Sequence, residues 1–463
     1  MLFNSYGFLF LFLPIAFALY FIFNRIRLTT ASRVWLSLAS LFFYSFWDIR
    51  YLPLLLLTII VNFILGNALS VAFNTRTEDE SRARRRLYLW LGLGWNLVLL
   101  IFFKYFDFFL VNLNAVTGGS LSPLKIILPL GISFFTFTQI AYLVDCYKGE
   151  VKESSIVNYF LFVTFFPHLL AGPIIHHKEM MPQFDSRRAK ILNYRNIAIG
   201  ISLFSLGLFK KVLIADAFSP FANEGFDNSI ALTFVEAWAA SLSYTFQIYF
   251  DFSGYTDMAL GISWLFNIRL PFNFNSPYKA VNIQDFWRRW HMTLSRFLRD
   301  YIYIPLGGNR SGETRTYLNL MAVFLIGGFW HGAGWTFLFW GLLHGIASAV
   351  HRLWQSSGLR MNRYIAIFLT FNFINITWVF FRAKDWESAI KVLKGMSGLN
   401  GILLPHFLEG KLSFLTSYGI SFGEWLSNVK GDPKTIPLIV FFFIFSVFLN
   451  NSNQVIEKLK FDV

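Results

Sequence analysis

Two histidines lie in the apolar stretch FLIGGFWHGAGWTFLFWGLLHG at 324–345, and both are candidates for chemistry. An ionisable side chain is costly in an apolar segment, and an imidazole that titrates near neutral pH suits general acid–base catalysis. His331 lies between Trp330 and a glycine-rich break, where a small substrate group has room to approach its ring. We therefore take His331 as a functional candidate. For His344, near the expected helix end, we expect a hydrogen bond to a neighbouring helix instead.

The glycines of the same stretch indicate how its helices pack. The stretch has two GxxxG steps, Gly328–Gly332 and Gly341–Gly345, and each contains one of the histidines. Glycines at this spacing let two helices approach closely in a membrane. The sequence therefore predicts that helices approach closely at these glycines.

A second cluster, at 268–310, is too polar to span a membrane but is rich in aromatic residues. We predict a helix from Asn282 onward, with Asn282 as its cap and Asp285 near its positive end. Apolar residues would then share one face and arginines the rest; the apolar set is Trp287, Trp290, Leu294 and Leu298, and the basic set is Arg288, Arg289, Arg296 and Arg299.

Two interpretations of this arginine-rich helix stay open. It is either a surface helix that holds anionic membrane lipid, or its arginines attract an anionic cytosolic donor, such as the phosphates of coenzyme A or phosphopantetheine.

Other sites are weak or absent in the sequence. IPLGGNR is no P-loop, because no GK[ST] follows its glycines, and no G-x-S-x-G is present. His168, His176 and His177 lack a zinc-binding pattern, so we predict no metal site. Asp251 and Asp257 flank a Ser-Gly pair, where we expect them to cap a broken helix rather than to hold a cation.

The composition sets the class of protein that holds these residues. Of the 463 residues, 55% are hydrophobic, 20% aromatic and only 14% charged, whereas a soluble domain is about a quarter charged. This excludes an ordinary soluble enzyme, and the aromatic content excludes a disordered chain. The net charge of +14 resides in short loops, as the positive-inside rule predicts, so we expect no nucleic-acid binding.

We expect an all-α, polytopic integral membrane protein with about 10–12 transmembrane helices plus re-entrant segments. The candidate spans are 6–23, 34–47, 52–73, 87–110, 124–146, 197–217, 233–250, 317–333, 335–350, 362–381 and 436–450. The apolar stretch near 156–175 ends in HLLAGPII, whose Pro and Gly predict a broken, re-entrant backbone.

Arginines and lysines in alternate loops predict the orientation. Loops 24–33, 74–86 and 176–195 are basic, whereas 112–123 and 217–233 contain no Lys or Arg. This places the N-terminus outside and the C-terminus inside the cytoplasmic (inner) membrane. The segment 382–435 would then lie outside, with short amphipathic helices on the membrane surface. We expect 1–463 to be one integral membrane domain.

In these residues the chain resembles the membrane-bound O-acyltransferase family. The resemblance covers 168–383 and includes HLLAGPI with PQF, YTFQIYFDFSGYTDMALGI, FNFNSPY, WRRWHMTLSRFLRDYIYIPLGGNR, GGFWHGAGWTFLFWGLLHG and TWVFFRA, in the expected order. The bacterial branch of the family contains alginate O-acetylases, peptidoglycan O-acetyltransferases and the D-alanyl transfer protein of teichoic acid. The resemblance implies helices around a central tunnel with catalytic groups near the membrane centre.

The resemblance also implies roles for individual residues. His331 in GFWHG matches the family's catalytic histidine, and His291 in WRRWH matches a second functional histidine on the cytosolic side. We expect His331 and His291 to be catalytic, and His291, together with Asn273 or Asn275, is a candidate to orient the thioester carbonyl or to stabilise its oxyanion. Arg288 and Arg289 are candidates to bind the donor.

The function that the resemblance implies is transfer of an acetyl group from a cytosolic thioester to an exported cell-surface polysaccharide of the alginate type. Peptidoglycan O-acetylation is the alternative, followed by D-alanylation of teichoic acid. No bound cofactor is expected, because acetyl-CoA or a phosphopantetheine carrier is a substrate. Expected partners are an external acetyltransferase, the polysaccharide acceptor and membrane lipid. A transporter would be a different class of protein, but it leaves WRRWH and GFWHG unexplained. A scaffold of a polysaccharide export complex is a further alternative of a different class.

Overall fold

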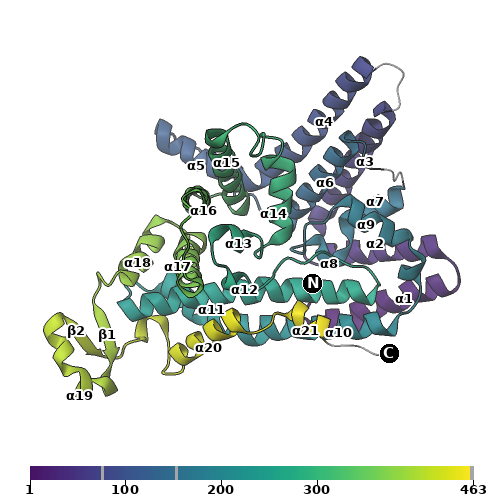
Figure 1. The fold of residues 1–463 in the computed structure, drawn as a ribbon. Helices are drawn as coiled ribbons and strands as arrows, with labels where there is room; N and C mark the ends of the chain where they lie inside the picture. The colour runs from purple at the N-terminus through teal and green to yellow at the C-terminus, as the bar shows by residue number, and fades with distance from the viewer. Residues whose placement is uncertain (74–77, 152–154, 459–463) are drawn as a thin grey trace. The chain divides into compact units, whose positions relative to one another are not determined.

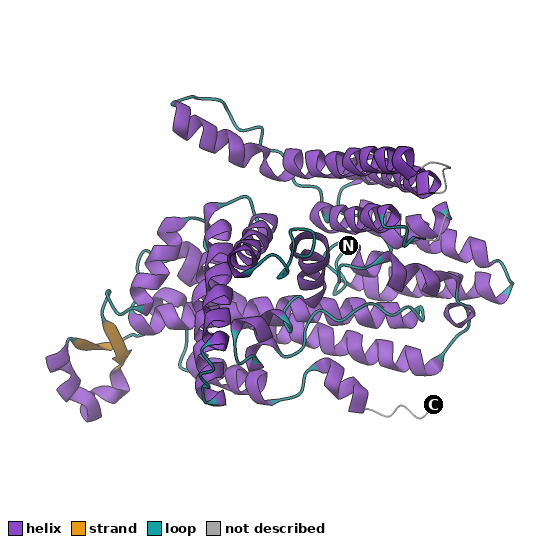
Figure 2. Ribbon diagram, turned by 45° about the horizontal axis from the view of Figure 1, so that its top comes forward, coloured by secondary structure: helices purple, strands orange, loops and turns teal. Residues whose placement is uncertain are grey.

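The computed structural model describes residues 1–73, 78–151 and 155–458, and nearly all of their regular structure is helical (Figures 1 and 2). Within these residues the strands are β1 (Ile402–Pro405) and β2 (Ile420–Gly423), which pair in parallel with Ile402 opposite Ile420. The expectation of an all-α protein is confirmed. The small sheet was not predicted, because four-residue strands give too short a pattern to recognise.

The chain forms two compact units that alternate along the sequence. The first consists of residues 1–207, 255–273 and 456–463, and the second of 208–254 and 274–455. Both candidate histidines, His291 and His331, belong to the second unit.

The first unit is built from helices, most of which pack on one another. They are α1 (Leu13–Arg25), α2 (Thr29–Ser45), α3 (Leu52–Phe73), α4 (Glu78–Leu100), α5 (Phe106–Thr117), α6 (Ile132–Tyr147), α7 (Ile156–Thr164), α8 (Phe166–Leu169), α9 (His177–Asp185) and most of α10 (Tyr194–Phe209). The last turns of α12 (Phe234–Leu265) also belong to this unit.

The helix predicted to break near 156–175 is broken, whereas its re-entrant course in the membrane stays a prediction. Helix α7 stops at Thr164, Phe165 has a non-helical backbone, and α8 lasts only four residues. A Cβ at Gly172 would lie 2.3 Å from the His168 Cα, so the chain can return this closely only with glycine there.

The second unit contains the rest of α12, the helix α11 before it and the helices after it. These are α11 (Asp216–Asn223), α13 (Ile283–Trp287), α14 (Met292–Leu298), α15 (Glu313–His331), α16 (Trp335–Ser356), α17 (Arg363–Arg382), α18 (Trp386–Met396), α19 (Glu409–Leu412), α20 (Thr435–Phe448) and most of α21 (Ser452–Lys458). Helix α18 is amphipathic, as predicted for part of 382–435, with Ala389 and Val392 buried.

Aromatic rings dominate the core of the second unit. Trp290, Trp340 and Trp378 are all nearly inaccessible to solvent. The rings of Trp340 and Trp378 stack at 5.8 Å, and those of Trp290 and Trp378 lie 4.9 Å apart. Large rigid rings lose little conformational entropy when they are buried, so this core can hold neighbouring side chains in fixed positions.

Five helical stretches among the described residues are long and apolar enough to cross a membrane, and a bent sixth joins Thr435–Phe448 to Ser452–Lys458. The five are Phe8–Arg25, Ile49–Ala72, Glu80–Thr117, Tyr194–Asn228 and Arg363–Arg382. They support a multi-pass membrane protein. The expected count of about 10–12 spans stays a prediction, as does the orientation of the termini.

The expectation for Asp251 and Asp257 was wrong. Both lie inside the continuous helix α12, whose course Gly254 does not interrupt. Asp251 instead pairs with Lys211, whose Nζ lies 2.7 Å from its Oδ1. An isolated glycine within an apolar helix is tolerated when packing supports the helix, and a Ser-Gly pair alone therefore does not establish a break.

Candidate active site

Close contact between α15 and α16 positions the first candidate histidine. A Cβ at Gly328 would lie 2.4 Å from the Phe337 carbonyl oxygen, and one at Gly341 would lie 2.3 Å from that of Phe324. Neither site therefore accommodates a side chain without a backbone shift. The prediction that the glycines allow close helix approach is confirmed at Gly328 and Gly341.

His331 is the last residue of α15 and is partly exposed. The chain then turns extended through Gly332 to Gly334 before α16 begins. Three aromatic rings meet the imidazole nearly edge to face, those of Trp330 at 4.9 Å, Trp340 at 5.3 Å and Phe381 at 5.0 Å. These rings hold the imidazole in one orientation while part of it stays accessible.

His291 lies at a break that the sequence did not predict. The expected continuous helix from Asn282 is instead two short ones, α13 and α14, separated at 288–291. The Asn282 cap is confirmed, because its side chain accepts a hydrogen bond from the Asp285 amide at 2.7 Å. His291 itself has φ 42° and ψ 54°, a left-handed conformation that costs a non-glycine residue roughly 1–2 kcal/mol.

The break brings His291 into the core. Its side chain is almost fully buried, as are Trp290 and Leu294, so this segment is not a helix that lies on a lipid surface. The His291 ring contacts Phe252 at 4.8 Å and Trp330 at 6.3 Å. Trp330 also contacts His331. Both candidate histidines therefore pack against one indole ring, although they lie 40 residues apart in sequence.

His344 is held by hydrogen bonds through both ring nitrogens. The Trp287 indole N–H donates to Nδ1 at 3.2 Å, and Nε2 lies 3.2 Å from the Thr377 hydroxyl. That hydroxyl donates to the Ile374 carbonyl. These contacts fit the tautomer with its hydrogen on Nε2, and they leave neither nitrogen for a substrate. The predicted hydrogen bond from His344 to a neighbouring helix is confirmed.

Of the candidate donor-binding residues, Arg289 has internal contacts. Its Nε donates to Asp285 Oδ1 at 2.8 Å, and its carbonyl accepts from the Asn275 amide at 2.9 Å. The Asn275 side chain accepts a hydrogen bond from Asn451 at 3.1 Å. Arg289 and Asn275 thus brace the loop before α13.

The other two candidates differ in exposure. Arg288 is exposed, so it can meet an anion in solution. Asn273 is buried and belongs to the first unit. Donor-binding roles for Arg288, Arg289, Asn273 and Asn275 stay predictions.

An ion pair fixes the end of α17 beside His331. Arg382 pairs with Asp227 and also donates to the Asn223 side chain at 2.8 Å. Its guanidinium lies over the Phe226 ring at 5.5 Å. Because Phe381 precedes Arg382 in the same helix, the ion pair also restrains the ring that contacts His331.

The sequence did not identify Trp330, Phe381 and Trp287 as positioning residues. Each of these residues lies within or next to one of the sequence motifs described above. Only the folded structure shows which histidine each one contacts. Among the described residues no group of three His, Cys, Asp or Glu side chains is arranged to hold a metal ion. What the site offers is an accessible imidazole at a helix break and a second, buried imidazole nearby.

The chain is similar to a known protein family and to several known proteins. The model of the membrane-bound O-acyltransferase family matches residues 41–384, which include both histidines. A peptidoglycan O-acetyltransferase of Helicobacter pylori is 50% identical over the whole chain and 92% of its own length. A probable alginate O-acetylase of Azotobacter vinelandii is 38% identical over 90% of this chain and 82% of its own. A teichoic acid D-alanyltransferase of Bacillus subtilis is 29% identical over 57% of this chain and 71% of its own.

The family match extends over more than half of the chain, and relatives well above 30% identity cover most of it. The chain is thus an acyltransferase and a multi-pass membrane protein, and it belongs to the membrane-bound O-acyltransferase family.

Proposed function

We propose that the chain passes acetyl groups from a cytosolic thioester across the membrane for O-acetylation of peptidoglycan. The observation that carries the chemistry is the position of His331, partly exposed at the helix break and held by three aromatic rings. The observation that favours this acceptor is the 50% identity, over the full chain, to a protein named peptidoglycan O-acetyltransferase. Two relatives named as probable alginate O-acetylases are 38% and 39% identical to this chain.

The proposed reaction needs a base at the hydroxyl group that first receives the acetyl group, before its delivery to the sugar. His331 takes the hydroxyl proton as the oxygen attacks the thioester carbonyl, and a tetrahedral intermediate forms. When the C–S bond breaks, the imidazolium returns the proton to the leaving thiolate. The products are an acetyl ester and a free thiol, and His331 is regenerated.

His291 is a positioning residue in this proposal. Its buried ring shares Trp330 with His331, so it can fix the indole that orients the base. Hydrogen bonds to the developing oxyanion would come from groups near the thioester, for which Asn273 and Asn275 are the candidates. Arg288, which is exposed, would attract the phosphates of a coenzyme A or phosphopantetheine donor.

Delivery to the sugar would involve a second protein. We propose that an external acetyltransferase receives the acetyl group and completes transfer to the polymer, with the segment 382–435 as its docking region. The proposal requires the segment and the N-terminus to lie outside the inner membrane and the C-terminus to lie inside. An alginate-type polysaccharide is the second candidate acceptor, on the strength of the alginate O-acetylase relatives.

Ester-bound acetate identifies the acceptor. Peptidoglycan and surface polysaccharide are purified separately from wild-type cells and from cells that lack the gene, and mild base releases their acetate. We expect the deletion to remove acetate from peptidoglycan alone. Loss from the surface polysaccharide alone would favour the second candidate. Unchanged acetate in both polymers would overturn O-acetylation, and D-alanine esters would then be measured.

A further inference from the structure

A basic cavity in the first unit lies apart in sequence from WRRWH and GFWHG. It has a volume of about 680 Å³, and its lining includes Arg188, Arg195 and Arg269. Among the described residues that line it, none is acidic. We refer to it as the Arg188 cavity. Three guanidinium groups around one hollow favour an anionic ligand with several oxygen acceptors.

Hydrogen bonds hold polar side chains that line the Arg188 cavity in fixed positions. The Gln183 amide exchanges two hydrogen bonds with the Arg269 backbone, at 2.8 and 3.0 Å. The Asn196 side chain donates to the Asn267 side chain at 2.8 Å. The Arg269 guanidinium stacks over the Trp264 ring at 4.7 Å. These contacts hold the lining residues in place, but none of them neutralises the positive charge of the arginines.

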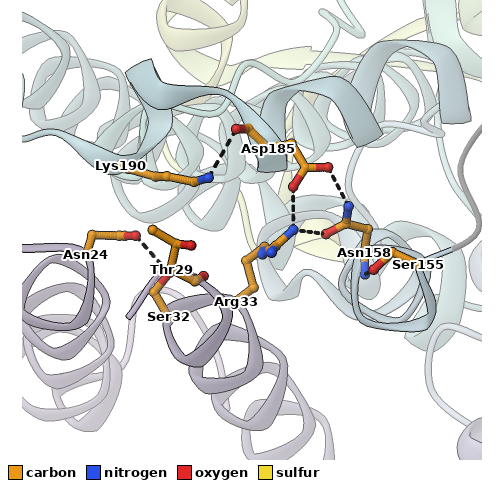
Figure 3. Close-up of polar contacts among 8 residues, drawn as sticks. All are labelled: Asn24, Thr29, Ser32, Arg33, Ser155, Asn158, Asp185 and Lys190. Carbon is orange, nitrogen blue, oxygen red and sulfur yellow. Dashed lines mark hydrogen bonds and ion pairs between the residues drawn. The ribbon is translucent and has the colours of Figure 1, made fainter. Parts of the chain in front are cut away.

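The acid nearest to Arg188 in sequence is engaged elsewhere. Figure 3 shows the Asp185 carboxylate bound by Arg33 and by the Asn158 amide, while Lys190 donates to the Asp185 carbonyl. Within the described part of the chain, none of the three cavity arginines forms an ion pair with an acidic side chain. The Arg188 cavity therefore keeps its positive charge.

The Arg188 cavity lies at the end of a candidate span. Tyr194–Asn228 is long and apolar enough to cross a membrane, and Arg195 and Asn196 are in its first turn. Beside them Ile191 and Tyr194 are 66% and 70% exposed. Exposed apolar and aromatic side chains next to arginines are typical of the level of lipid headgroups. The amino end of helix α10 adds further positive potential there.

We propose that the Arg188 cavity binds the phosphate group of an anionic phospholipid headgroup. The neighbouring Ile191 and Tyr194 would contact the acyl chains, which a soluble phosphate compound would not require. Lipid binding at this place is independent of the proposed acyl transfer, and binding measurements test it without any assay of activity.

The test uses the full-length protein in an uncharged detergent, with lipid adducts measured by native mass spectrometry. The probes are dioctanoyl phosphatidylglycerol, dioctanoyl phosphatidylcholine, coenzyme A and inorganic phosphate. The test variant is Arg188→Gln/Arg195→Gln. The matched control is Arg187→Gln/Arg360→Gln, which removes the same charge at exposed positions outside the cavity. Melting midpoints without lipid show whether each variant is folded, and Arg188→Gln alone serves if the double variant is not.

We expect phosphatidylglycerol to bind more tightly than phosphatidylcholine and to bind more weakly at high salt. Each arginine near an anionic lipid contributes about fivefold in affinity, so the test variant should lose about 25-fold while the control keeps most of its affinity. Equal affinity for the two lipids, or equal losses in the two variants, would overturn the proposal. Displacement of phosphatidylglycerol by coenzyme A or inorganic phosphate would also overturn it, because the ligand would then be a soluble phosphate.

Discussion

Replacing Gly328 by alanine should separate α15 from α16 and disturb His331. The added methyl group would lie 2.4 Å from the Phe337 carbonyl oxygen. That oxygen belongs to the backbone of α16 and cannot rotate away. Because ordinary contact begins near 3.4 Å, the helices must separate by about 1 Å.

The expected size of the effect follows from two opposing contributions. Alanine in a helix is favoured over glycine by about 0.5–1 kcal/mol. Overpacking costs about 1–3 kcal/mol, so we expect a net loss of about 0–2.5 kcal/mol in the free energy of unfolding. The shift also moves Trp340 away from the His331 ring. Misplacement of catalytic groups by about 1 Å can lower the rate about 100-fold, and activity should therefore fall more than stability.

Gly327→Ala is the matched control on the same helix. A Cβ at Gly327 would meet only the flexible end of Leu298, at 3.4 Å, so this variant should keep its melting midpoint or gain stability. Ester-bound acetate is measured at equal membrane abundance, together with the melting midpoint of each purified variant. If Gly328→Ala matched Gly327→Ala in both measurements, the close helix contact would not position His331 as described.

Further variants test the roles of His344, Arg382 and Asp385. His344→Gln should lower the melting midpoint. It should keep more acetate transfer per folded molecule than His331→Gln, because His331→Gln removes the proposed base. Equal losses of transfer in the two variants would contradict a structural role for His344. Arg382→Gln should cost about 1–3 kcal/mol because it leaves Asp227 without its main partner, and adding Asp227→Asn should recover part of this loss in a double-mutant cycle. Asp385→Ala removes the cap of α18 and should cost about 1 kcal/mol, whereas Asp385→Asn should cost less. The backbone hydrogen bond from Ser388 lowers the pKa of Asp385. The ionised Asp385 cap should therefore stabilise the fold near neutral pH, and this stabilisation should be lost as the pH falls below about 4. Acid unfolding of wild type and Asp385→Asn would check this.

Much of the fold followed from the sequence because apolar helices leave strong patterns. The long stretches, the break near 156–175 and the Asn282 cap each depend on neighbours in sequence, and all were predicted. Local patterns failed where tertiary packing decides the backbone. The break at His291 buries Trp290 and His291 together, and no periodicity in WRRWH indicates it. Likewise Asp251 stays inside a continuous helix, and its partner Lys211 is 40 residues away.

The sequence named the candidate histidines, but it did not indicate how they are held in space. His331 and His344 have similar surroundings in sequence, each within apolar residues and beside glycine. They differ because Trp287 and Thr377 occupy both nitrogens of His344, and these partners come from distant segments. The contact of His291 and His331 with Trp330 depends in the same way on packing that no single segment specifies.

The central claim is that His331 is the base for acetyl transfer, and the most direct measurement is ester-bound acetate on peptidoglycan in cells that carry His331→Gln. Wild type and the deletion are measured beside it, with the variant at wild-type membrane abundance. We predict that His331→Gln lowers the acetate to the level of the deletion. If acetate stayed at the wild-type level in His331→Gln but was lost in the deletion, a catalytic role for His331 would be contradicted. The chain would then be needed for the transfer without His331 acting as the base.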